Sequence, residues 1–401
     1  MERIISFLKR WWVWPALLAL SPLFWWYVQV GAASVNFPNT NFFKLWLAGH
    51  LAGIGSNPYS LQDWFNGHTA FGATWIPEGI FLYPLPLAYF LIPLGWLALS
   101  QAYSVWAFLT LLATTASLFL LIDLWEESRL KIFALPMMVA LFFFAPMLEA
   151  PGKGTLGGLL LLAMVLSLYL FNHRMWLIGG MLSALLLVKP TFGAPALILL
   201  GLWFLSRREW RGIVGIITGS LFLYALGAVV NPQWPLQFLV MGQQKVGEYL
   251  GTQPTALNVA GFFCQRSPAC SYGLGAAVSL VLIGVVVFLI FRKTRLLDSL
   301  EAMSLILTTS LLVTPYLWSY DFVLLIIPLS WIVHQLILRT KSYWVPILFL
   351  ITLDIIAGAG LYLQSVSPQK DLWNILIPMA LMGMLIWMIQ PFSNTTEKAG
   401  S

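Results

Sequence analysis

Residues 273–291 read GLGAAVSLVLIGVVVFLIF, and Arg292 and Lys293 follow directly. This uncharged, mainly apolar run is about as long as an α-helix must be to cross the hydrocarbon core of a bilayer. Its hydrophobic residues are continuous, whereas the strands of a transmembrane barrel alternate apolar and polar positions. The stretch therefore predicts a transmembrane helix with a basic pair at its cytoplasmic end.

The same character extends over the whole chain. Of its 401 residues, 60% are hydrophobic and only 9% are charged. A soluble domain carries about 25% charged residues, and so few charges cannot build a surface that faces water. We therefore expect an all-α, polytopic transmembrane helical bundle in a cell membrane.

Thirteen apolar segments follow one another along the sequence. A full span needs about 20 residues, and several of the segments are shorter than that. Such helices are tolerated where neighbouring helices or a polar cavity satisfy their backbone groups. The segments cover about 11–33, 81–98, 102–122, 132–148, 155–171, 175–188, 190–206, 212–230, 273–291, 299–314, 321–338, 343–362 and 372–390.

Basic residues gather in short clusters between these segments. Cytoplasmic loops of membrane proteins carry an excess of Lys and Arg, so we place the clusters and both termini in the cytoplasm. The same bias accounts for the net charge of +6, and we expect no nucleic acid as a partner. The clusters are Arg3/Lys9/Arg10, Arg207/Arg208/Arg211, Arg292/Lys293/Arg295 and Arg339/Lys341.

The number of crossings follows from this orientation. Two cytoplasmic termini require an even number, so one of the thirteen segments must be re-entrant or half-length, unless a segment is wrongly divided. The first candidate is 81–98, because Pro84, Pro86 and Pro93 interrupt it. We expect about twelve spanning helices plus this one segment.

These residues form one expected domain, 1–392, followed by a polar cytoplasmic tail at 393–401. Two large loops, about 34–80 and 231–272, lie on the expected outer face, and frequent aromatic residues indicate that both are ordered. The second loop holds both cysteines of the chain, Cys264 and Cys270. They either form a disulfide in an oxidising compartment or remain free thiols.

Three stretches on the outer face are unusually polar for their position. The first runs from Thr40 through the first loop to Pro86, the second covers 146–155 with Lys189-Pro190 nearby, and the third is 314–321. Turns, aromatic belts and snorkelling lysines also produce such patterns. Their common face favours a functional site, because ionisable residues near membrane depth are functional candidates by default.

The chain lacks the motifs of a soluble enzyme. It has no phosphate loop, dinucleotide fingerprint or nucleophile triad, and no Asp-x-Asp pair that would hold a divalent cation with a sugar nucleotide. Two cysteines without a nearby histidine do not make a zinc site. We therefore expect no metal site and no bound cofactor.

From about residue 35 to 340 the chain resembles glycosyltransferase family 87, membrane enzymes of the GT-C superfamily that include polyprenol-phosphate-mannose-dependent mannosyltransferases. The family pattern is an acid and an aromatic early in the first outer loop, then Asn-Pro-Tyr, Tyr-Pro-Pro, Gly-Gln, Lys-Pro and a late Ser/Thr-Pro-Tyr with Tyr-Asp. The corresponding residues here are Asn41-Phe42, Asn57-Pro58-Tyr59, Tyr83-Pro84-Leu85-Pro86, Gly152-Lys153, Lys189-Pro190, Thr314-Pro315-Tyr316 and Tyr320-Asp321.

The resemblance implies a GT-C-like bundle and a glycosyltransferase. It would move mannose or another hexose or pentose from a polyprenyl-phosphate donor to an acceptor on the extracytoplasmic face, by a metal-independent inverting displacement. Partners would be membrane lipid, the lipid-linked donor, and a glycan, glycolipid or protein acceptor. The residues implied in substrate binding are Asn57, Tyr59, Tyr83, Lys153, Lys189, Tyr316, Tyr320 and Asp321.

The chain departs from the family at the catalytic acid, because Asn41 stands at that position. An amide cannot accept the proton of an acceptor hydroxyl as a carboxylate can. Asp63 is the first substitute because it belongs to the same loop, and Glu149 and Glu78 follow. A second departure is Lys153 in place of the family's Gln, and a lysine suits a phosphate as a point charge.

Two other functions stay open. Asn41 favours a catalytically inactive binding or scaffold protein with the same fold. Proline-broken helices are also found in transporters, so a lipid-linked substrate transporter or flippase is the other alternative. The sequence shows no inverted repeat and its polar stretches gather on one face, which favours the glycosyltransferase.

Overall fold

The computed structural model describes residues 13–32, 40–73, 81–125, 141, 144, 146–147, 153–293, 297–342 and 344–389. Within these ranges the chain is helical and contains no strand. Most of the predicted segment 132–148, the tail 393–401, and the candidate acids Glu78 and Glu149 lie outside the described residues.

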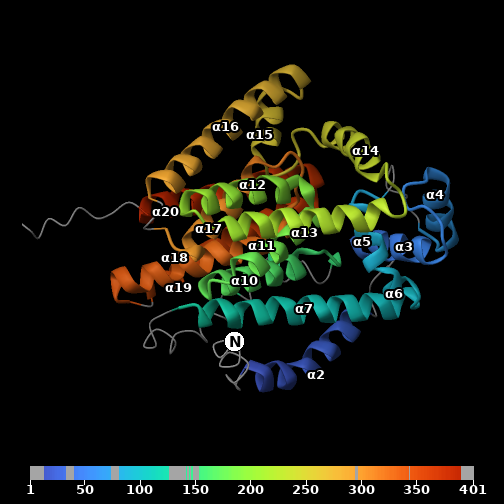
Figure 1. Cartoon of the computed structure of the whole chain (residues 1–401), viewed down its shortest axis with the longest axis horizontal. Coiled ribbons are helices and arrows are strands. Elements are labelled where there is room, and N and C mark those ends of the chain that lie inside the picture. The colour runs from blue at the N-terminus through green and yellow to red at the C-terminus, as the bar shows by residue number, and fades with distance from the viewer. Residues whose placement is uncertain are drawn as a thin grey trace, which may run out of the picture.

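The described helices lie side by side in one elongated bundle (Figure 1). In chain order they are α2 (Val13–Ala32), α3 (Asn41–Gly53), α4 (Leu61–Ala70), α5 (Leu85–Phe90), α6 (Ile92–Gly95), α7 (Leu99–Asp123), α10 (Gly157–Asn172), α11 (Trp176–Ser183), η3 (Ala184–Val188), α12 (Pro190–Arg207), α13 (Trp210–Ala228), α14 (Trp234–Glu248), α15 (Ala256–Phe263), α16 (Pro268–Arg292), α17 (Ser299–Val313), η4 (Ser319–Leu325), α18 (Ile326–Thr340), α19 (Trp344–Val366), η5 (Pro368–Ile375) and α20 (Leu376–Ile389).

Apart from 81–98, the predicted apolar segments that fall on described residues become helices, or pairs of consecutive helices, with similar bounds. The opening stretch 273–291, for example, lies within α16. Among the described residues, seven helices are long and apolar enough to cross a membrane, and three apolar helices are shorter. The protein is therefore a helical membrane protein, and the number of about twelve spans stays a prediction.

The centre and the rim of the bundle differ in exposure. In α18, Ile326, Ile327 and Leu329 are completely buried, as are many neighbours in α17. At the rim, Leu221 of α13 and Leu280 of α16 are 60% and 68% exposed. Such large exposed apolar side chains are costly in water, and a lipid environment removes this cost.

Basic residues meet at one end of the bundle. Arg207, at the end of α12, donates to the carbonyl of Leu297 at 2.7 Å. Lys293 and Arg339 donate to the carbonyls of Ile389 and Met388 at the end of α20. Cations are favourable at helix C-termini, where carbonyl groups lack helical partners. We call this the basic end, and three of the predicted cytoplasmic clusters contribute to it.

The opposite end carries the loop helices, with α3 to α6 and α14 together at the right of Figure 1. We call it the loop end. The proline-rich segment 81–98 lies here as α5 and α6, which contain 6 and 4 residues. Both are too short to cross a bilayer, which agrees with the predicted half-length segment.

The two cysteines form a disulfide. Cys264 follows α15 and Cys270 lies in the first turn of α16, and their Cα atoms are 5.7 Å apart. The disulfide alternative is therefore confirmed over two free thiols. Disulfides persist in oxidising compartments, which agrees with an outer position of the 231–272 loop.

We predict that the loop end faces outward and the basic end faces the cytoplasm. Gln62→Cys, at an exposed position of α4, should react with a membrane-impermeant maleimide on intact cells. Lys341→Cys, exposed at the end of α18, should react only after permeabilisation. Labelling of Lys341→Cys on intact cells would contradict the predicted orientation.

Candidate active site

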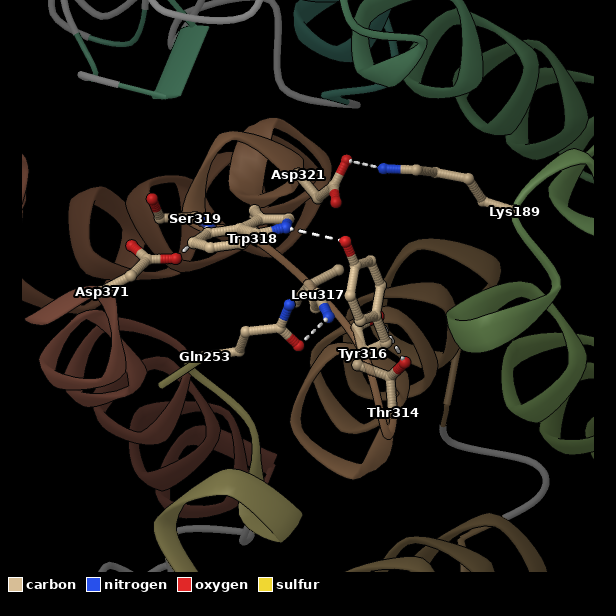
Figure 2. A network of polar contacts seen from close by, with 9 residues as sticks. All are labelled: Lys189, Gln253, Thr314, Tyr316, Leu317, Trp318, Ser319, Asp321 and Asp371. Atoms are coloured by element: carbon tan, nitrogen blue, oxygen red, sulfur yellow. Dashed lines mark hydrogen bonds and ion pairs between the residues drawn. The ribbon is translucent and has the colours of Figure 1, made fainter. Parts of the chain in front are cut away.

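An ion pair lies where two helices begin at the loop end. Lys189 directly precedes α12 and Asp321 lies in η4, and Lys189 Nζ is 2.5 Å from Asp321 Oδ1 (Figure 2). The two side chains are only 13% and 3% exposed. Removing one partner of a buried pair leaves an uncompensated charge, so the pair fixes α12 against η4.

A second lysine approaches the same place. The Nζ atoms of Lys153 and Lys189 each lie 5.4 Å from the centre of the Tyr320 ring. The negative face of an aromatic ring attracts cations. One ring therefore gathers two ammonium groups from distant segments, and such a group of cations suits an anionic ligand such as a phosphate.

The turn before η4 presents aromatic and hydroxyl groups. Trp318 Nε1 donates to the Tyr316 hydroxyl at 3.1 Å, and Thr314 Oγ1 donates to the carbonyl of Tyr316 at 3.2 Å. Burial raises the pKa of the Tyr316 phenol. The hydroxyl therefore keeps its proton at neutral pH and can donate it to a ligand oxygen.

Tyr83 lies directly after the first loop, at the start of the segment 81–98. Burial raises the pKa of Tyr83, and the negative charge of Asp321 raises it further. The carbonyl of Tyr83 accepts a hydrogen bond from the Tyr59 hydroxyl at 2.7 Å. The Tyr59 hydroxyl thus joins the Asn57-Pro58-Tyr59 turn to Tyr83. Tyr83 is in turn close enough to Asp321 to be affected by its negative charge.

Asn41 lies near the second polar stretch. It opens α3, where the Thr40 side chain caps the helix through the backbone of Phe43. Its neighbour Phe42 packs so closely on Gly154 that a Cβ there would lie 2.3 Å from the Phe42 Cβ. The family acid position is therefore next to the segment that carries Lys153.

Asp63 makes its contacts within the first loop. Its Oδ2 atom accepts from the backbone of Asn57 at 3.3 Å, and Asn57 Oδ1 accepts from the backbone of Tyr59 at 3.0 Å. The Asp63 residue is only partly buried. These contacts give Asp63 and Asn57 a structural role, and the role of Asp63 as a base stays a prediction.

Two residues that the sequence analysis did not single out hold the turn from its other side. Gln253 Oε1 accepts from the backbone of Leu317, and Asp371 Oδ2 accepts from the backbone of Ser319, both at 3.2 Å (Figure 2). Asp371 Oδ1 also accepts from Asn374 at 2.7 Å. One sequence signal could have identified Asp371 as a candidate. It directly precedes a predicted apolar segment, and Asp321 begins another.

An apolar groove adjoins the ion pair. It has a volume of about 260 Å³ and lies between α5, η3, the start of α12, α13 and α14. Pro84 and Pro190 line it, directly beside Tyr83 and Lys189 in the chain. The groove therefore reaches the residue that follows Lys189 in the chain.

Acidic and metal-ligating side chains are dispersed. In the part of the chain that the structure describes, no three His, Cys, Asp or Glu side chains form a group that would hold a metal ion. Among the described residues named above, the charged groups at the turn are the two lysines and Asp321 on one side and Asp371 on the other.

The sequence profile of glycosyltransferase family 87 matches residues 81–315. The chain belongs to glycosyltransferase family 87. The family is one of membrane glycosyltransferases, in agreement with the apolar bundle. The matched range includes Tyr83, Lys153 and Lys189, whereas Asn41 precedes it and Tyr320 follows it. No curated protein sequence and no solved structure matches this chain.

The contacts of Asp371 predict a stabilising role. In Asp371→Asn, an NH₂ group must face one of the two N–H donors, because an amide has a single acceptor oxygen. We expect the free energy of unfolding to fall by about 1–3 kcal/mol, measured by thermal unfolding of the purified protein in detergent. Glu209→Gln, at the basic end, is the control and should leave the midpoint unchanged. Equal midpoints for both variants would contradict the role of Asp371.

Proposed function

We propose that the protein transfers a sugar from a polyprenyl-phosphate donor to an acceptor at the loop end, on the extracytoplasmic face of a cell membrane. The observation that supports this best is the convergence of Lys153 and Lys189 on Tyr320 beside an apolar groove. A lipid-linked phosphate combines the two chemistries that meet there, a hydrocarbon chain and an anion.

The groove gives the donor its orientation. Leu239 of α14 and Leu223 of α13 line it, and both helices expose apolar residues at the bundle surface. An isoprenoid chain in the groove would bring its phosphate to Lys189, since Pro190 belongs to the lining. The sugar would then lie near Tyr83 and Tyr316, whose neutral phenols donate hydrogen bonds.

The reaction is a single displacement with inversion. A base takes the proton of the acceptor hydroxyl, the acceptor oxygen attacks the anomeric carbon, and the bond from this carbon to the phosphate oxygen breaks. Polyprenyl phosphate leaves with the bonding electrons, and its growing negative charge is stabilised by Lys153 and Lys189. No metal takes part in this scheme.

The base must be a carboxylate that reaches the acceptor. The Asp371 residue is fully buried and the Asp321 side chain is only 3% exposed, and both are already paired. Asp63 is only partly buried and belongs to the loop that supports Tyr83. Glu248 is exposed and precedes Tyr249, whose ring packs against Tyr316 at 5.7 Å. Asp63 is the leading candidate and Glu248 is the second.

One observation favours a different function. Asn41 stands where the family has its acid, so a protein that binds the lipid-linked sugar without transferring it is the second candidate. Transfer of labelled sugar by the purified protein in liposomes separates the two functions, because a binding protein retains the donor unchanged.

The donor site predicts a defined effect of Lys153. In Lys153→Met the stem of the side chain is kept and the charge is lost. Donor affinity should fall by about 1–3 kcal/mol, the scale of a charge-assisted hydrogen bond, measured by binding of a radiolabelled polyprenyl-phosphate sugar. Lys341→Met, at the basic end, is the matched control and should bind normally. Unchanged affinity in Lys153→Met would remove Lys153 from the donor site.

The identity of the base is tested by removing and restoring carboxylates. Asp63→Asn should lower the rate of sugar transfer by about 10²–10⁴-fold, the usual contribution of general-base catalysis, whereas Glu248→Gln should have little effect. The reverse result would assign the base to Glu248. Asn41→Asp should increase transfer if the site is degenerate. Unchanged or lower transfer indicates that another carboxylate serves as the base, because two nearby carboxylates raise one of their pKa values.

A further inference from the structure

A single acidic residue lies in the middle of the apolar helix α19. Asp354 is the eleventh of the 23 residues of this helix, counted from Trp344. The helix is long and apolar enough to cross a bilayer, so the carboxyl group lies near the middle of the membrane. Ionisable residues at this depth are costly, and they almost always pair with another polar group or face a water-filled cavity.

Asp354 has no such partner within the described part of the bundle. No hydrogen bond or ion pair joins it to another described residue, and it does not line the groove beside the Lys189–Asp321 pair. One helical turn away, Leu350 and Ala357 are each 2% exposed, whereas Ile351 is 49% exposed. Asp354 therefore lies at the border between the packed side of α19 and a side that the described bundle leaves uncovered.

The uncovered side has the spacing of a seam between two helices. A strip of residues separated by three or four positions runs along it, and every member is partly or fully exposed. A Cβ at Gly358 would have no atom within 4 Å, and small residues let helices approach closely in membranes. We call these residues the α19 strip: Ile351, Asp354, Gly358, Leu361 and Ser365.

The charge of Asp354 decides what fits the strip. The acyl chain of a lipid offers a carboxylate no partner. A second copy of this chain, packed symmetrically through the same strip, would bring two carboxylates together, and like charges disfavour each other. A Lys or Arg on the neighbouring helix would instead form an ion pair and offset the cost of both charges.

We propose that the α19 strip binds a transmembrane helix of another membrane protein, in which a Lys or Arg near mid-depth pairs with Asp354. The strip contains none of the residues assigned to sugar transfer, so this inference is independent of the proposed function. It identifies a partner by its chemistry, an apolar helix with one basic residue near its centre.

The first test uses a model helix as the partner. The protein with Lys341→Cys, just before α19, is labelled with a fluorescent maleimide and reconstituted in phosphatidylcholine liposomes. Cys264 and Cys270 do not react because they form a disulfide. Synthetic Leu/Ala transmembrane peptides carry an energy-acceptor dye and either Lys or Leu at the centre. The Lys peptide should associate about 5-fold more strongly or better, the scale of polar contacts between membrane helices.

Variants of the strip determine whether Asp354 causes this preference. Asp354→Leu should abolish it, and Asp354→Asn should weaken it because the amide has no charge. Gly358→Ile should weaken association of the Lys peptide, whereas Ala359→Ile, exposed on α19 but outside the strip, is the matched control. Size-exclusion profiles in detergent verify the folding of each variant. Equal association of both peptides with Asp354 intact, or an unchanged preference in Asp354→Leu, would overturn the proposal.

The second test asks whether a second copy of the chain occupies the strip. Two batches of the Lys341→Cys protein, labelled with donor and acceptor dyes, are mixed in liposomes. The proposal expects only the energy transfer of randomly dispersed molecules. Stronger transfer that Asp354→Leu or Gly358→Ile abolishes would assign the strip to a homodimer and overturn the basic partner helix.

Discussion

The ion pair between Lys189 and Asp321 is the contact on which the rest of the site depends. It joins residues 132 positions apart, at the beginnings of α12 and η4, where little water reaches either charge. A buried charge requires a partner, so the pair constrains where the two helices begin. Tyr320 is adjacent to Asp321, and its ring is therefore fixed in the position that both lysines approach.

The contacts on the other side of the turn complete this constraint. The backbone N–H groups of Leu317 and Ser319 precede the first helical hydrogen bond of η4. Gln253 accepts from Leu317, and Asp371 accepts from Ser319. Because Gln253 comes from the second large loop, the position of Tyr320 depends on that loop as well as on the bundle. The loop is itself restrained by the Cys264–Cys270 disulfide, which joins α15 to α16.

The sequence predicted the helices well because their physical signal is local. A continuous apolar run bounded by Arg292 and Lys293 needs no partner to be read as a membrane helix, and α16 agrees with it. The pairing of Lys189 with Asp321 is a tertiary contact, so each residue was a candidate from its own motif, but their contact was not predicted. Gln253 was missed because an isolated amide in a polar loop resembles any other loop residue until its backbone partner is known.

The charge balance of the site gives Asn41 a physical meaning. On the Lys189 side of the turn, two lysines and one aspartate leave one net positive charge, and a second carboxylate, Asp371, lies on the other side of the turn. A polyprenyl-phosphate sugar carries one negative charge, and the phosphate that leaves gains further negative charge as the bond to the sugar breaks. In the proposed transfer, the local positive charge stabilises the leaving phosphate more strongly than the bound donor. An aspartate at position 41, next to the Lys153 segment, would cancel part of this advantage. Under the proposed function, the amide in this chain preserves the field that acts on the leaving group, and the proton is taken by a carboxylate farther from the lysines.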